Sequence, residues 1–222
     1  MKTNLALLAA GCSLLAISAC QKSSADSSNA KLMFVNGSVG ATSTSLAVNG
    51  AALANAGNIA YLGNSGYQAA AAGNATLTAS LTGVGSLGSL TATLTANDNY
   101  SVVECGTILA DSIIIVNDAL PAASGNYAYA RLINASSDTS ATAITAAAGN
   151  TVVGSNIAYA AASGWTQVSP GSYSLTAFNV NAPGNVATLS ATQLNSGKFY
   201  TLLYSGNANQ TVGFKLTVIN NN

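Results

Sequence analysis

The chain has 222 residues, and only 5% of them are charged, with six basic side chains balancing six acidic ones. A chain without a basic surface has little to attract nucleic acid, so we expect no nucleic-acid partner. Histidine is absent, which excludes catalytic centres of the Ser-His-Asp or Cys-His type. Apolar residues make up 49% of the sequence and alternate with hydroxyl and amide side chains, a pattern typical of folded β-strands rather than of disordered segments.

The N-terminus resembles the signal peptide of a bacterial lipoprotein. The uncharged run of residues 5–19 is too short to span a bilayer and is typical of the apolar region of a signal peptide. It ends in "ISAC", which resembles the lipobox that signal peptidase II recognises, so we predict a signal peptide over residues 1–19 and a diacylglycerol group on Cys20. Two alternatives remain open: lipidation at Cys12, which follows "AAG", and an ordinary secretory signal with a chance cysteine.

A lipidated cysteine would place the protein in the bacterial cell envelope, because two or three acyl chains form a stable membrane anchor. A residue other than aspartate, here Gln21, follows the cysteine. By the enterobacterial sorting rule this implies transport to the outer membrane. Small polar residues come next, and we predict a flexible tether over residues 20–30 that keeps the folded part close to the membrane.

Two similar stretches of sequence follow, offset by 98 residues: "NIAYLGNSGY" begins at Asn58 and "NIAYAAASGW" at Asn156. The same offset aligns "FVNGS" with "LINAS", and a gain of two residues then aligns "NYSVVECG" with "FYTLLYSG". Such a conserved order predicts a tandem duplication. We place unit one at residues 31–118, a linker rich in Pro, Gly and small residues at 119–126, and unit two at 127–222.

Each unit has the alternation of apolar and polar residues that β-strands show. In "NATLTASL", Leu77, Ala79 and Leu81 lie on one face and hydroxyl side chains lie on the other. With Gly and Asn turns between such stretches, the pattern predicts an all-β fold of two tandem immunoglobulin-like antiparallel β-sandwiches. The stretches "SVVEC", "SIIIVN" and "YTLLYS" are apolar on both faces, as central strands can be. We expect each sandwich to be self-sufficient, so that residues 122–222 fold alone.

Several motifs of unit two resemble a known family in their order and spacing. "ARLINASSD", "NIAYAAASGW", "PGSYSLTA" and "LNSGKFYTLL" are similar to successive motifs of the DUF4397 family, and unit one matches through "LAVNG", "NIAYLGNSGY" and "NDNYSVV". The resemblance implies a domain of unknown function that occurs, often repeated, in secreted and surface proteins. Members often have histidine where Asn134 stands and aspartate in the second strand, where this chain has Ala143 or Thr145. The family assigns no activity.

Carboxylates are the remaining candidates for chemistry in the folded part, and there are five: Asp98, Glu104, Asp111, Asp118 and Asp138. A glycosidase needs two carboxylates that face one cleft, but four of these lie in unit one without counterparts in unit two. Asp98, Asp111 and Asp118 have the residue type of a Ca²⁺ site at one end of a sandwich, although turn residues in contact with solvent are the simpler interpretation. We therefore expect no catalytic residue, no metal site and no cofactor.

Four aromatic residues of the two repeated phrases are the candidates for a ligand-binding face, because aromatic rings stack on sugars and peptides: Tyr61, Tyr67, Tyr159 and Trp165. The competing interpretation, which the duplication itself favours, is that these rings pack at the end of each sandwich. Cys105 is replaced by Ser205 in unit two, so we predict a small buried thiol there, with an intermolecular disulfide as the alternative.

These features together predict a lipoprotein that is anchored in the membrane of the bacterial cell envelope and displays two β-sandwich modules. We expect a structural or adhesive role, or the binding of a glycan or protein ligand. The alternatives are an accessory subunit of an envelope complex and a hydrolase of surface glycans.

Overall fold

The computed structural model of the chain describes residues 28–122, 125–138, 143–179, 181–208 and 212–222. The predicted signal peptide, Cys20 and most of the tether lie outside the described residues, as do two residues of the predicted linker. Every regular element in the described ranges is a β-strand, so the prediction of an all-β fold is confirmed. None of the described segments forms a helix with the length and apolarity that a membrane span requires.

The alternation of side chains explains why these segments form strands. In β5 (Gly73–Leu81), every second side chain around Leu77 is buried, whereas Thr76 is exposed. The corresponding strand of unit two, β14 (Gly171–Asn179), buries Leu175 in the same position. A strand of this pattern is stable only when its apolar face is covered by a second sheet.

Unit one consists of two four-stranded sheets. Besides β5, its strands are β1 (Asn29–Asn36), β2 (Thr44–Val48), β3 (Ala51–Ala52), β4 (Asn64–Ala71), β6 (Gly85–Leu94), β7 (Asn99–Thr107) and β8 (Ala110–Asn117). We call the sheet with the order β4-β1-β7-β8 the inner sheet of unit one, and the sheet with the order β3-β2-β5-β6 its outer sheet.

Unit two repeats this arrangement. Besides β14, its strands are β9 (Ala128–Asn134), β10 (Ile144–Ala148), β11 (Thr151–Ile157), β12 (Ala161–Ala162), β13 (Thr166–Val168), β15 (Ala182–Leu194), β16 (Phe199–Asn207) and β17 (Gly213–Asn220). Its inner sheet has the order β12-β9-β16-β17, with β13 also paired to β9, and its outer sheet has the order β11-β10-β14-β15.

Most neighbouring strands pair antiparallel, as predicted, but each inner sheet contains one parallel pair. Strand β1 runs parallel to β7, and β9 runs parallel to β16 in the same register. The first strand of each unit, β1 or β9, therefore pairs with its second-last strand, β7 or β16. The N-terminal and C-terminal parts of each unit thus lie in the same inner sheet.

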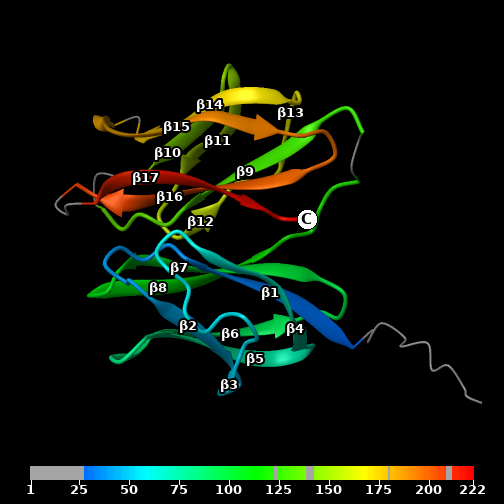
Figure 1. Cartoon of the computed structure of the whole chain (residues 1–222), viewed down its shortest axis with the longest axis vertical. Coiled ribbons are helices and arrows are strands. Elements are labelled where there is room, and N and C mark those ends of the chain that lie inside the picture. Colours follow the sequence, from blue (N-terminus) through cyan, green and yellow to red (C-terminus); the bar gives the residue numbers. More distant parts are fainter. Residues whose placement is uncertain (1–27, 123–124, 139–142, 180, 209–211) are drawn as a thin grey trace, which may run out of the picture.

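The four sheets stack as four layers, with the two inner sheets facing each other in the middle of the molecule (Figure 1). One apolar cluster fills the sandwich of unit one, and a second fills that of unit two. A third cluster lies between the two inner sheets and draws side chains from both units. The central strands of the inner sheets are thus covered on both faces, which explains their apolar sequences: β1, β7, β9 and β16.

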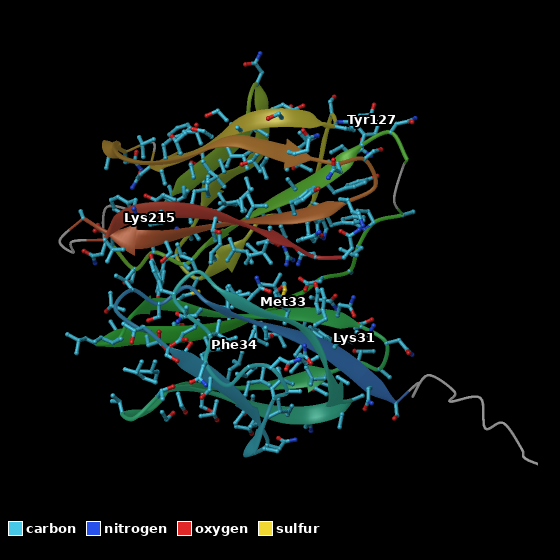
Figure 2. All side chains as sticks on the ribbon, in the orientation of Figure 1. Lys31, Met33, Phe34, Tyr127 and Lys215 are labelled. Atoms are coloured by element: carbon cyan, nitrogen blue, oxygen red, sulfur yellow. The ribbon has the colours of Figure 1, made fainter. Side chains whose placement is uncertain are left out.

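Neighbouring residues of β1 show this double burial. Phe34 packs in the cluster of unit one, whereas Met33 belongs to the cluster between the units. In Figure 2, Met33 points toward unit two and Phe34 points away from it. Both side chains are at most 1% exposed.

Candidate functional site

The inner sheets contact each other through what we call the inter-unit interface. We define it by eight buried side chains, four from each unit: Met33, Val35, Val103, Cys105, Ile133, Ala135, Leu203 and Ile219. Each of them is at most 3% exposed. An apolar contact of this kind holds two domains in a fixed arrangement, because separating them would expose the whole apolar face to water.

Equivalent residues of the two units meet at the centre of this interface. Ala135 has in unit two the position of Gly37 in unit one, and a Cβ atom added to Gly37 would lie 2.9 Å from that of Ala135. The backbones approach this closely because Gly37 has no side chain. The Ser205 hydroxyl donates to the carbonyl oxygen of Gly37 at 2.6 Å, and the Gly106 N–H donates to that of Ala135 at 2.8 Å. The units are therefore related by an approximate two-fold axis.

The first tyrosine of each repeated phrase reaches across this axis. The hydroxyl oxygen of Tyr61 lies 3.0 Å from Oγ of Ser205, so the two groups share a hydrogen bond. The hydroxyl of Tyr159 lies beside Gly106, which follows Cys105, the counterpart of Ser205. Burial raises the pKa of Tyr61, and it raises that of Tyr159 to about 12. Both phenols stay protonated at neutral pH and serve as polar ends of packed rings.

The second aromatic residue of each phrase also lies at the interface. The Tyr67 hydroxyl donates to Oδ2 of Asp118 at 2.6 Å. The guanidinium group of Arg131 lies 4.5 Å from the centre of the Trp165 ring, and this ring meets Phe199 edge to face with centres 5.5 Å apart. The structure thus brings all four candidate rings to the contact between the units.

A buried ion pair lies at the centre of these contacts. Arg131 and Asp118 are each 1% exposed, and Nη2 of Arg131 donates to Oδ1 of Asp118. The same nitrogen donates to Oγ of Ser101 at 3.2 Å, and Nε donates to Oγ1 of Thr201 at 2.9 Å. Buried charges are tolerated only with such a set of partners.

Further hydrogen bonds close a polar network around the pair. Asp118 Oδ2 accepts a second bond from Ser101 at 2.8 Å, and Thr201 donates to Asn221 Oδ1 at 2.7 Å. Nδ2 of Asn221 then donates to the Tyr67 hydroxyl at 3.1 Å. Burial and the charge of Asp118 raise the pKa of Tyr67 far above its usual value, so this phenol remains a donor.

The ion pair was not predicted from the sequence. Its one signal was Arg131 itself, a lone charge in the apolar run "AYARLINA", which forms a strand with every residue buried. A charge in such a strand needs a buried partner. Nothing in the local pattern identifies that partner as Asp118, because the contact depends on how the two units pack.

The predicted carboxylate candidates do not converge. Asp98 accepts hydrogen bonds from side chains of its own unit, and Asp118 pairs with Arg131. Asp111 lies inside unit one beside Glu104, with both carboxylates buried. In unit two, Asp138 accepts the N–H of Ala208 at 2.7 Å. Asp98, Asp111 and Asp118 therefore do not form the Ca²⁺ site that their residue type suggested.

Cys105 is fully buried in the inter-unit interface, as predicted. Its Sγ atom lies 3.7 Å from the carbonyl oxygen of Val103. Burial raises the pKa of the thiol well above its usual value, which leaves it protonated and unreactive.

A shallow groove of about 370 Å³ lies at the open edge of unit one, between the β2–β3 turn and β4. Its lining consists of Val48, Asn49, Ala51, Ala52, Leu53, Ala54, Ala69, Ala70 and Ala71. Asn49 is the one polar side chain among these residues. The groove lacks the converging polar groups that orient a small molecule in a binding site.

The comparison with protein families bears on both units. The family model for DUF4397, a domain of unknown function, matches residues 30–145 and again residues 128–222. No curated protein matches the chain. Because the two matches together cover nearly all of the described residues, the chain belongs to the DUF4397 family and carries its domain as a tandem repeat.

Proposed function

We propose that this protein is a lipid-anchored component of the bacterial cell envelope in which two DUF4397 domains, fused face to face, act as one rigid structural or binding element. The observation that carries the proposal is the inter-unit interface, which is apolar at its centre and contains a buried ion pair. A rigid body on a short tether suits a spacer or a display element at a membrane.

The placement of the aromatic residues supports a structural role for the repeated phrases. Tyr61 forms a hydrogen bond with Ser205, and Tyr67 forms one with Asp118. Trp165 packs against Arg131 and Phe199. Rings in these positions stabilise the contact between the units. A binding role would therefore use the outer surface of the molecule rather than these rings.

The lipid anchor rests on the sequence "ISAC" and is tested by metabolic labelling with radioactive palmitate. Cys20→Ala should abolish labelling of the full-length protein, because this thiol carries the diacylglycerol, and should leave an unprocessed or soluble protein. Cys12→Ala is the matched control and should label normally. Unchanged labelling of the Cys20→Ala protein would overturn the anchor at this position, and loss of label in the Cys12→Ala protein would move it there.

A further inference from the structure

Inside unit one, six side-chain oxygen atoms are buried without a hydrogen-bond partner of good geometry. They belong to Ser38, Thr44, Glu104 and Asp111, the last two with both carboxylate oxygens. Ser38, Thr44 and Glu104 are 0% exposed. Buried polar atoms in proteins are almost always paired, so a cluster of six unpaired oxygens requires an explanation.

The strand arrangement brings these four side chains to the same end of the sandwich. Strands β1 and β7 are parallel and end there, and β2 and β8 begin there. In the β7–β8 pair, Glu104 lies opposite Ile113, which faces the core of unit one. Asp111 precedes Ile113 by two residues, so its side chain lies on the same face of the sheet. The two carboxylates are therefore diagonal neighbours on the inner face of this pair.

The two hydroxyl groups complete the cluster from other segments. Thr44 begins β2 in the outer sheet, and its hydroxyl faces Glu104 closely enough to lower the pKa of that carboxyl. Ser38 follows β1, and its hydroxyl has the same effect on Asp111. The two carboxyl groups also contact each other closely enough to shift each other's pKa. None of these contacts has the geometry of a hydrogen bond, so the six oxygens lie near one another without satisfying one another.

Among the described residues, the two carboxyl groups have no cation beside them to balance the charge that they carry when ionised. Burial, and in second place the neighbouring Asp111, raise the pKa of Glu104 to about 8, and burial raises that of Asp111 to about 6. The other titratable groups nearby are Cys105, on the opposite face of β7, and Tyr159 of unit two, and neither provides positive charge. In the described part of the chain, no lysine or arginine pairs with either carboxylate.

Unit two has aromatic residues at the positions of the two carboxylates. Tyr204 has the position of Glu104, and Phe214, opposite Gly206, has the position of Asp111. The two rings stack with centres 5.4 Å apart. These two strand positions can therefore be filled by an aromatic pair in the same fold, and the carboxylate pair at them is found in unit one alone.

We propose that Ser38, Thr44, Glu104 and Asp111 bind one Ca²⁺ ion inside unit one. Ca²⁺ takes six to eight oxygen ligands with little demand on geometry, and two carboxylates balance its charge. The four residues offer no nitrogen or sulfur donors, so they are poor ligands for Zn²⁺ and copper. Within the described ranges no three acidic, histidine or cysteine side chains gather, so the hydroxyl oxygens are needed to complete the coordination.

The proposal is tested with calcium chloride and the full chain, first stripped of metal with a chelator. Equilibrium dialysis at pH 8 should show one Ca²⁺ bound per chain. At a Ca²⁺ concentration about 100 times the dissociation constant, Tm should rise by roughly 5–10 °C, and chelator should reverse the rise. Glu104→Gln and Asp111→Asn should each abolish binding, whereas Asp98→Asn, a carboxylate of the same unit outside the cluster, should leave it unchanged.

The pH dependence gives a second readout. Without Ca²⁺, the raised pKa values stabilise the folded chain in acid, and this stabilisation is lost as the pH rises from about 4.5 toward 8, because the unfolded chain releases these protons at lower pH. Ca²⁺ competes with the same protons. The Ca²⁺-induced rise in Tm should therefore grow between pH 5 and pH 8.

A double variant guards against a loss of binding through misfolding. Glu104→Tyr with Asp111→Phe copies the aromatic pair of unit two and should fold without binding Ca²⁺. Two results would overturn the proposal: a full chain that binds no Ca²⁺ at pH 8, or binding that persists in both Glu104→Gln and Asp111→Asn. In the first case the two carboxyls form a buried pair that shares a proton instead.

Discussion

Arg131 combines a full set of polar partners with an aromatic neighbour. Its guanidinium group donates to Asp118, Ser101 and Thr201, and its flat face lies against Trp165. Removing two opposite charges from water is costly, and this geometry offsets the cost rather than producing a large net gain. The role of the pair is to fix how the two units sit on each other.

Substitution of one residue of the Arg131–Asp118 pair should lower the stability of the protein, because the other charge stays buried without its partner. Arg131→Met leaves Asp118 buried without a cation, and we expect a loss of about 3–5 kcal/mol of unfolding free energy in urea titrations. Met33 and Asn221 hold the equivalent positions of Arg131 and Asp118 in the other unit. The double variant Arg131→Met with Asp118→Asn should therefore regain most of that loss. A double variant no more stable than the single one would show that the pair itself stabilises the fold.

At the scale of the strand, the central strands of the inner sheets differ from those of an ordinary sandwich because both of their faces are buried. In β16, Leu202 packs inside unit two and Leu203 packs between the units, and both are 0% exposed. A strand with one face in water would tolerate a small residue at every second position. In β16, truncating a large side chain on either face leaves a cavity.

Alanine substitutions in β16 test this double burial. Leu202→Ala and Leu203→Ala should each cost about 2–5 kcal/mol, because both leave a cavity in a packed cluster. Leu109, which is 93% exposed in the β7–β8 turn, is the matched control, and Leu109→Ala should stay within about 0.5 kcal/mol of the parent. A small effect of Leu203→Ala alone would mean that the two inner sheets separate readily in solution.

Local sequence patterns predicted where the strands lie better than they predicted which segments pack against those strands. The alternation around Leu77 correctly indicated β5 and its buried face, because one residue in two contacts the core. Periodicity also marked β7 and β16 as apolar on both faces, but it does not say what covers the second face. The pairing of Leu46 with Ala79 and of Ala146 with Ala177 shows a further limit. Ala79 and Ala177 keep the offset of 98 residues, whereas Leu46 and Ala146 are offset by two residues more, because the segments that precede β2 and β10 differ in length.

The sequence identified the aromatic residues of the candidate site but not the residues that they contact. The repeated phrases pointed to Tyr67 and Trp165 as a matched pair, and both lie at one interface. Their contacts with Asp118 and Arg131 join segments far apart in the chain. Such contacts follow from the packing of two sandwiches, which no short stretch of sequence encodes.

At the scale of the whole molecule, the apolar interface makes the two units dependent on each other. Unit two alone would expose Ile133, Leu203 and Ile219, which are at most 3% exposed in the intact chain, together with the Arg131 guanidinium. The sequence alone led us to expect that residues 122–222 fold independently. The structure refines this expectation: such a fragment has its own sandwich core but also a large apolar face.

Two complementary fragments test this dependence. Residues 122–222 alone should bind a hydrophobic dye and self-associate, since the apolar face is uncovered. Mixing them with residues 28–121 should give a one-to-one complex, release the dye and shift the emission of Trp165, the only tryptophan, to shorter wavelength. Size-exclusion chromatography and fluorescence measure both effects. A monomeric second fragment that binds neither dye nor partner would mean that the interface contributes little.

The approximate two-fold axis has a consequence for how the protein can vary. In a dimer of identical subunits, every substitution at the axis occurs twice, so an ion pair such as Arg131–Asp118 would have to be present in two copies or absent. Joining the subunits into one chain removes that constraint. Each side can then change alone. The difference between Cys105 and its counterpart Ser205, and that between Tyr67 and its counterpart Trp165, are examples of such independent change. A mutation at this axis alters one contact where in a homodimer it would alter two.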